Sequence, residues 1–136
     1  MDWEVIFQLI LAVFFGALIG FEREFKGKEA GLQTYSLVSL GACLFTIVGF
    51  KLFGEFSGAS ILSVATGIGF IGAGVIIHKQ DHTEGITTAA GLWCMSAVGV
   101  AVGAKFYIFS LIAVLLTSVI LVGFGMLERK ALKNRK

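Results

Sequence analysis

Residues 5–21 read VIFQLILAVFFGALIGF, an apolar run without a charged side chain. A helix needs about 20 such residues to cross the hydrocarbon core of a bilayer. Four further apolar runs follow, at residues 35–53, 61–77, 86–104 and 106–127. The sequence therefore predicts an all-α fold, a polytopic integral membrane protein built as a bundle of about five transmembrane helices.

The composition supports a membrane protein. Of the 136 residues, 57% are hydrophobic and 15% are charged, and the mean hydropathy is +0.90. One water-soluble globule of this size cannot bury that much apolar surface, so the surplus must face lipid. The net charge of +2 gives no basis for nucleic-acid binding. Cys43 and Cys94 lie within apolar runs as small hydrophobic residues, and we expect no disulfide.

The number of spans depends on the last apolar stretch. A single helix over residues 86–127 would be far longer than the bilayer is thick. Gly103 and Lys105 are therefore expected to mark a tight turn between two spans. A bundle of four spans is the alternative.

The basic residues predict an orientation. In a five-span bundle Lys51 and Lys105 fall on one side, and nine basic residues fall on the other: Arg23, Lys26, Lys28, Lys79, Arg129, Lys130, Lys133, Arg135 and Lys136. By the positive-inside rule, the N-terminus lies outside and the C-terminus in the cytoplasm. Residues 129–136 then form a short basic cytoplasmic tail, which we expect to touch anionic lipid.

Glycine must provide any close helix approach, because the chain has 18 glycines and no proline. In the third span Gly69 and Gly72 share one face, and Gly67 and Gly74 fall roughly on the opposite face. Small residues on two faces let neighbouring backbones approach from both sides, which predicts a central position for this helix. The alternative is a broken helix whose free backbone groups line an ion or substrate site.

The fourth span carries a stripe of small residues: Thr87, Ala90, Gly91, Cys94, Ala97 and Ala101. We expect this stripe to pack against the third helix or a second copy of the chain, with Trp93 on the opposite face, and it predicts a homodimer or larger assembly. The hydroxyls of Thr87 and Thr88 either bond to their own helix or offer oxygens to a ligand at the helix N-terminus.

Residues 22–34 are the most charged part of the chain. On a continued first helix, Glu22 pairs with Lys26 and Glu24 with Lys28 at i,i+4 spacing. Glu22 and Glu24 are weak candidates for Mg²⁺, because residues two apart on a helix point to different sides. A metal site would need a further ligand from another helix.

Arg23 lacks an acidic residue at i+4, since that position is Gly27. Its guanidinium therefore needs a carboxylate from elsewhere in the chain, the carbonyl end of another helix, or a lipid phosphate.

A second polar cluster comprises His78, Asp81, His82 and Glu84. His78 and His82 have the i,i+4 spacing of two metal ligands on a helix, but without a third ligand a solvated interfacial loop is favoured. The sequence contains no combination of nucleophile, base and orienting group, so an enzyme is disfavoured.

Four motifs carry a family resemblance: GALIGFERE at residues 16–24, AGLQT at 30–34, GIGFIGAGVII at 67–77 and GITTAAGLW at 85–93. Over residues 7–128 the chain resembles the MgtC/SapB family of membrane proteins, in the short form without the soluble cytoplasmic domain of longer members. The resemblance implies a bacterial inner-membrane protein, and better-known members are linked to survival at low magnesium and to virulence.

The chain departs from the family pattern at several positions. Glu29 stands where a proline is usual, Gln33 where a basic residue is usual, and Glu84 where arginine is common. Thr87 occupies a position where longer members carry asparagine. The two lost positive charges alter any partner or phosphate contact made there.

The resemblance favours a non-enzymatic regulator that acts on other membrane proteins, including the proton-driven ATP synthase. The candidate polar cluster is Glu22, Arg23, Glu24, Thr34, Thr87 and Thr88. The alternative is an oligomeric transporter or channel for Mg²⁺ or another ion. The acids between residues 61 and 104 are Asp81 and Glu84, both in the loop, which disfavours that alternative. We expect the lipid bilayer, a second copy and another membrane protein as partners, and no cofactor besides a possible Mg²⁺ ion.

Overall fold

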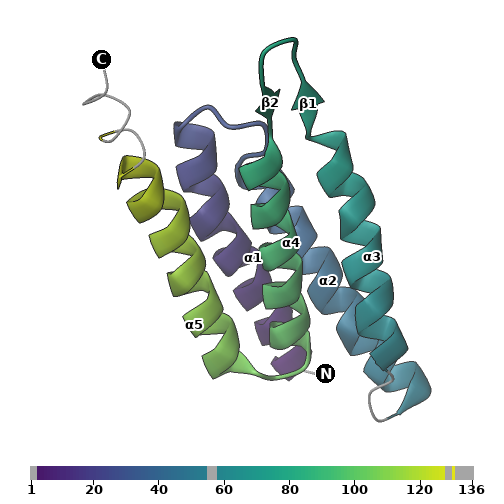
Figure 1. Cartoon of the computed structure of the whole chain (residues 1–136). Helices are drawn as coiled ribbons and strands as arrows, with labels where there is room; N and C mark the ends of the chain where they lie inside the picture. The colour runs from purple at the N-terminus through teal and green to yellow at the C-terminus, as the bar shows by residue number, and fades with distance from the viewer. Residues whose placement is uncertain (1–2, 55–57, 128–129, 131–136) are drawn as a thin grey trace.

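The computed structural model describes residues 3–54, 58–127 and 130. It is a bundle of five α-helices with one short hairpin, which confirms the all-α membrane fold predicted from the sequence (Figure 1). The elements are α1 (Trp3–Phe25), α2 (Leu32–Phe53), α3 (Gly58–Gly74), β1 (Ile77–His78), β2 (Thr83–Glu84), α4 (Ile86–Gly103), α5 (Tyr107–Ser118) and the π-helix η1 (Val119–Phe124) that continues α5.

Successive helices run in opposite directions (Figure 1). The α1–α2 loop and the β1–β2 hairpin therefore lie at the same end of the bundle, which we call the hairpin end. Among the described residues, four helical segments are long and apolar enough to cross a membrane: Trp3–Phe25, Leu32–Phe53, Ile86–Gly103 and Tyr107–Leu127. The apolar part of α3, Ile61–Gly74, is shorter.

A tight turn separates α4 from α5. Lys105 adopts a φ of 68°, which a residue other than glycine seldom does, and its N–H donates to the Val102 carbonyl. Its ammonium lies 2.7 Å from the Glu4 carboxylate at the start of α1. The chain therefore reverses at the place where Gly103 and Lys105 predicted a turn.

Glycines bring the backbones of α1 and α4 against α2. A Cβ at Gly16 would lie 2.6 Å from the Tyr35 carbonyl oxygen, and one at Gly103 would lie 2.7 Å from the Cys43 carbonyl oxygen. A Cβ at Gly99 would overlap the Ser39 carbonyl oxygen. Such contacts are available only to residues without a side chain, so α2 is the central helix of the bundle.

The prediction that the third span is central is wrong. Helix α3 lies at the edge of the bundle (Figure 1), and a Cβ at Gly67, Gly69 or Gly74 would meet nothing within 4 Å. Of these α3 glycines in the described structure, only Gly72 would place a Cβ near another helix, 3.6 Å from the Ala89 Cβ. Small residues permit close approach but do not select the partner. Helix α3 is also continuous, unlike the broken helix considered as an alternative.

The small-residue stripe of the fourth span is partly buried within the bundle and partly exposed. Gly91 is buried against the Tyr35 ring of α2 and not against α3. Thr87, Ala90 and Ala97 are exposed, as is Trp93. The face of α4 that packs against α2 continues instead through Gly99 and Gly103.

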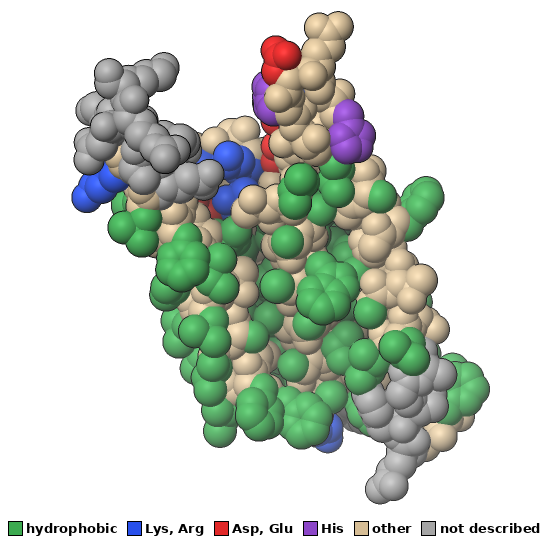
Figure 2. Space-filling view, viewed as in Figure 1, with side chains coloured by type: hydrophobic (Ala, Val, Ile, Leu, Met, Phe, Trp, Pro, Cys, Tyr) green, Lys and Arg blue, Asp and Glu red, His purple; other side chains and the backbone are tan. Residues whose placement is uncertain are grey.

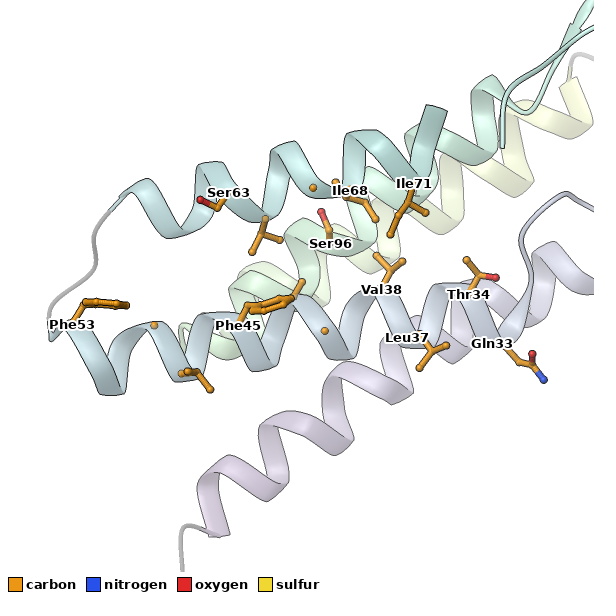
Figure 3. A pocket seen from close by; sticks show the side chains of 16 residues that line it. Gln33, Thr34, Leu37, Val38, Phe45, Phe53, Ser63, Ile68, Ile71 and Ser96 are labelled. Carbon is orange, nitrogen blue, oxygen red and sulfur yellow. The ribbon is translucent and has the colours of Figure 1, made fainter. Parts of the chain in front are cut away.

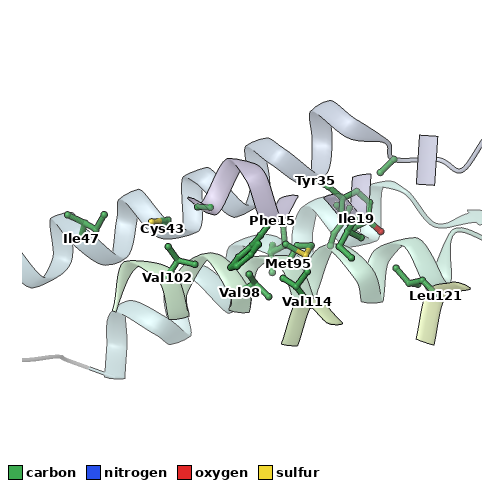
Figure 4. Packing of buried hydrophobic residues seen from close by; sticks show 14 residues of the cluster. Phe15, Ile19, Tyr35, Cys43, Ile47, Met95, Val98, Val102, Val114 and Leu121 are labelled. Atoms are coloured by element: carbon green, nitrogen blue, oxygen red, sulfur yellow. The ribbon is translucent and has the colours of Figure 1, made fainter. Parts of the chain in front are cut away.

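The core forms where α1, α2, α4 and α5 meet (Figure 4). Leu92, Met95 and Val98 of α4 are fully or almost fully buried, together with Phe15 and Val114. At the end opposite the hairpin, the buried Gln8 amide donates to the carbonyl oxygens at positions 102 and 103, each at 2.9 Å. Gln8 thus satisfies carbonyls at the C-terminus of α4 that lack partners within the helix.

Gly99→Ala should lower the melting temperature, because the new Cβ would overlap the α2 backbone. Alanine is favoured over glycine in a helix by about 1 kcal/mol, whereas overpacking costs about 1–3 kcal/mol. Gly67→Ala is the matched control, with open space around its Cβ. Thermal unfolding in mild detergent, followed by circular dichroism, compares the two variants, and equal melting temperatures would contradict the packing described here.

Candidate functional site

A chain of hydrogen bonds links α1, α4 and the α1–α2 loop at the hairpin end. Arg23, in the last turn of α1, is only 3% exposed, and its Nη2 donates to Thr88 Oγ1 at 3.3 Å. Thr88 Oγ1 in turn donates to Glu29 Oε2 at 2.5 Å. One hydroxyl thus accepts from a buried cation and donates to a carboxylate. We call this the Arg23–Thr88–Glu29 chain.

The position of Arg23 follows from the way in which α1 ends. The helix runs past the predicted residue 21 to Phe25, so Arg23 continues the buried face of Ile19 one turn later. The N–H of Gly27 donates to the Glu24 carbonyl and that of Lys28 to the Arg23 carbonyl, with φ 62° at Gly27. This is a Schellman motif, and it turns the loop back across the bundle toward α4.

Glu22 and Glu24 serve different partners. Glu22 pairs with Lys26, as the i,i+4 spacing predicts, and lies 3.9 Å from Arg23 Nη1. Glu24 Oε2 accepts from the Leu32 N–H at 2.7 Å and so caps the start of α2. Within the described part of the chain, no group of three or more Asp, Glu, His or Cys residues could hold a metal ion.

The remaining candidate residues lie in different places. Tyr35 is fully buried in α2, and its hydroxyl donates to the Thr88 carbonyl at 3.4 Å. This bond helps to hold Thr88 in place within the Arg23–Thr88–Glu29 chain. Thr87 is exposed beside Thr88, and Thr34 lines a groove between α2 and α3. The structure thus brings together Arg23 and Thr88 from the predicted cluster, with Glu22 alongside. It adds Glu29, whose only signal was its departure from the family pattern.

The histidines do not share a helix face. His78 lies on β1 and its Nδ1 is 3.1 Å from Thr83 Oγ1, while His82 Nε2 is 3.0 Å from Glu84 Oε1. Lys79 also pairs with Glu84, at 2.7 Å. The helical i,i+4 spacing considered for a metal therefore does not occur, because this segment is a β-hairpin.

A groove of about 890 Å³ separates α2 from α3 (Figure 3). It runs along α2 from Gln33 to Phe53, with Ser63, Gly67 and Ile71 of α3 on the other side. Ser96 of α4 also lines it. The walls are largely apolar, so the groove suits an apolar occupant.

The sequence matches the family model named "MgtC family" over residues 9–130. The chain belongs to the MgtC family. The protein SrpB of Synechococcus elongatus is 36% identical over 96% of this chain and 80% of its own length. The Escherichia coli protein named "Putative magnesium transporter YhiD" is 36% identical over 93% of this chain and 63% of its own.

Protein MgtC of Brucella abortus is 44% identical over 68% of this chain and 40% of its own length. This MgtC-family chain thus spans most of SrpB but less than two thirds of YhiD and of Brucella MgtC. No solved structure matches the chain. The family resemblance indicated by the four sequence motifs is therefore confirmed.

The Glu29 contact should make stability depend on acid. The hydrogen bond from Thr88 lowers the pKa of Glu29 below its usual 4.5, with smaller contributions from its own backbone and from Lys28 and Arg23. Because the pKa is lower in the folded state, this stabilisation is present above about pH 4.5 and is lost as pH falls through the lowered value.

Glu29→Gln should therefore melt below the wild type near pH 7, and the difference should shrink toward pH 3. The melting temperatures of both proteins are measured at a series of pH values. Taking the difference between the two proteins at each pH cancels the effect of the other carboxylates, which both proteins share. A difference that stays constant with pH would contradict the assigned role of Glu29.

Proposed function

We propose that this MgtC-family protein is a non-enzymatic protein of the bacterial inner membrane that binds and regulates other membrane proteins when magnesium is limiting. The observation that carries the proposal is the α2–α3 groove. The name of the E. coli relative, "Putative magnesium transporter YhiD", supports a magnesium-related setting, and neither this name nor that of Brucella MgtC describes an enzyme.

The occupant that fits the groove is a transmembrane helix of another protein. From Gln33 to Phe53 the groove follows α2 for about 30 Å at 1.5 Å per residue. This length equals the thickness of the hydrocarbon core, about 30 Å, so an occupant that spans the bilayer can fill it. Gly41, Gly49 and Gly67 line it, and such small residues let a helix backbone approach closely.

The proposed orientation places the hairpin end in the cytoplasm and the N-terminus outside. Arg23, Lys26 and Lys28 lie at the hairpin end with Lys79, and Lys51 and Lys105 at the other end, consistent with the positive-inside rule. Figure 2 shows apolar side chains along the visible flank and charged ones near its ends. Apart from Lys130, the predicted tail at residues 129–136 lies outside the described residues.

A photoreactive amino acid at Phe45, which lines the groove, should crosslink to another membrane protein in living cells. Gly67→Phe should reduce this adduct by about tenfold, because the ring would enter the groove and remove close packing. Gly69→Phe is the matched control, since Gly69 has open space around it but does not line the groove.

Equal adduct yields from the Gly67→Phe and Gly69→Phe proteins would contradict groove binding. An adduct at twice the chain's own mass would make the groove a homodimer interface and would also contradict this proposal. Circular dichroism of each variant establishes that it is folded.

The name of the E. coli relative favours a second function, transport of Mg²⁺. The apolar segments of the sequence argue against transport, because they contain no Asp, Glu, Lys, Arg or His. These segments are residues 5–21, 32–50, 58–76, 86–104 and 106–127. Divalent cation sites are built mainly from carboxylate and other oxygens, and ionisable groups within the membrane mark ion pathways.

We therefore expect no saturable Mg²⁺ flux from purified protein in sealed proteoliposomes containing Mg²⁺ and H⁺ indicators. Wild type, Arg23→Ala, Glu22→Gln and Glu24→Gln should give the leak of protein-free vesicles. Saturable flux in the wild type that a folded Glu22→Gln or Glu24→Gln protein lacks would establish the transporter instead.

A further inference from the structure

Arg23 is a buried cation whose charge is only partly compensated. Its side chain is 4% exposed, and the Glu22 carboxylate is 3.9 Å away and shared with Lys26. Its Nε has no hydrogen-bond acceptor within the described residues. A buried guanidinium costs folding free energy unless its donors and charge are satisfied. The surroundings of Arg23 therefore favour an additional anion.

Arg23 reaches the first turn of an 18-residue helix. Its Nη2 donates to Thr88 there, and the residue before the helix, Gly85, has no side chain with which to cap it. The first N–H groups of an α-helix lack partners within the helix, and the helix dipole makes this end positive. A guanidinium, a hydroxyl and a helix N-terminus thus converge, and each favours an oxyanion.

The Glu29 carboxylate already lies at this point, within hydrogen-bond distance of Thr88. Glu29 belongs to the loop between α1 and α2 and its side chain is exposed to solvent. Its hydrogen bond from Thr88 places a negative charge beside the first turn of α4. Because Glu29 stands on a loop and not on a packed helix, its carboxylate can move away without disrupting the bundle.

We propose that Arg23, Thr88 and the N-terminus of α4 form a binding site for a phosphate group, which Glu29 occupies as an internal substitute and with which it competes. Phosphate matches the paired donors of arginine and the N–H groups of a helix end. The positive charges of Lys28 and Arg23 both act on the Glu29 carboxyl and contribute to its lowered pKa, so Lys28 adds positive charge near the site. This inference does not depend on groove binding.

The phosphate can belong to a lipid headgroup or be free in the cytoplasm, and two arms distinguish these sources. In the first, ³¹P NMR follows titration of inorganic phosphate into protein in phosphatidylcholine nanodiscs. In the second, it follows the headgroup resonance of phosphatidic acid added to the same nanodiscs. Wild type, Glu29→Ala and three double variants are compared in each arm.

In at least one arm Glu29→Ala should bind phosphate about tenfold more tightly than the wild type, because the competing carboxylate is gone. Adding Thr88→Val should reverse that gain, whereas adding Thr87→Val, at the exposed neighbour, should leave it intact. Thr88→Ser, which keeps the hydroxyl, should also retain the gain.

Binding in one arm identifies the source of the phosphate and supports the site, as does binding in both. The proposal is overturned if Glu29→Ala binds no more tightly than the wild type in either arm. It is also overturned if Thr87→Val weakens binding as much as Thr88→Val. The comparison of wild type with Glu29→Ala changes no buried residue, and thermal unfolding of both proteins establishes that each is folded at the temperature of the titration.

Discussion

The close approach of α1 and α4 to the backbone of α2 is the constraint on which the rest of the structure depends. Lipid tails are as apolar as leucine, so helices in a membrane gain little from burying apolar side chains and associate through close packing and hydrogen bonds. Gly16 on one side of α2, and Gly99 and Gly103 on the other, remove the side chains that would hold the backbones apart. The same proximity brings the end of α1 to the beginning of α4, where Arg23 meets Thr88.

Polar contacts then fix both ends of the unit formed by α1, α2 and α4. At the hairpin end, the buried Arg23 is linked through Thr88 to Glu29. At the other end, Gln8 satisfies carbonyls at the C-terminus of α4, and Lys105 pairs with Glu4. A buried polar group is costly unless it is hydrogen-bonded, so these contacts favour one relative position of α1 and α4 over others. Rigid placement of the helix ends is what makes a defined anion site there physically reasonable.

Helix α3 is packed differently from the other helices. It contacts α4 where Gly72 meets Ala89, and the groove separates much of its remaining length from α2. Because the glycine faces of α3 make few contacts within the bundle, another helix can pack against them without displacing existing contacts. A helix bound in the groove, as proposed, would leave the glycine contacts of α2 intact. The proposed phosphate site lies at the ends of α1 and α4, so the two proposed activities, phosphate binding and helix binding in the groove, use separate parts of the molecule.

The sequence by itself determined the fold class, the turn near Lys105 and the family, because apolar length, glycine and short motifs are local properties. It also showed that Arg23 would need a partner outside its own helix, since Gly27 occupies the i+4 position. Only the tertiary structure decided which glycines pack, because a small residue permits approach from any neighbour and the sequence does not name that neighbour. It also revealed the structural roles of three polar residues whose partners are far away in the chain. Glu29 and Tyr35 bond to Thr88, and Gln8 bonds to the carbonyls of Val102 and Gly103. These partners meet only because the glycine contacts around α2 bring the helices together.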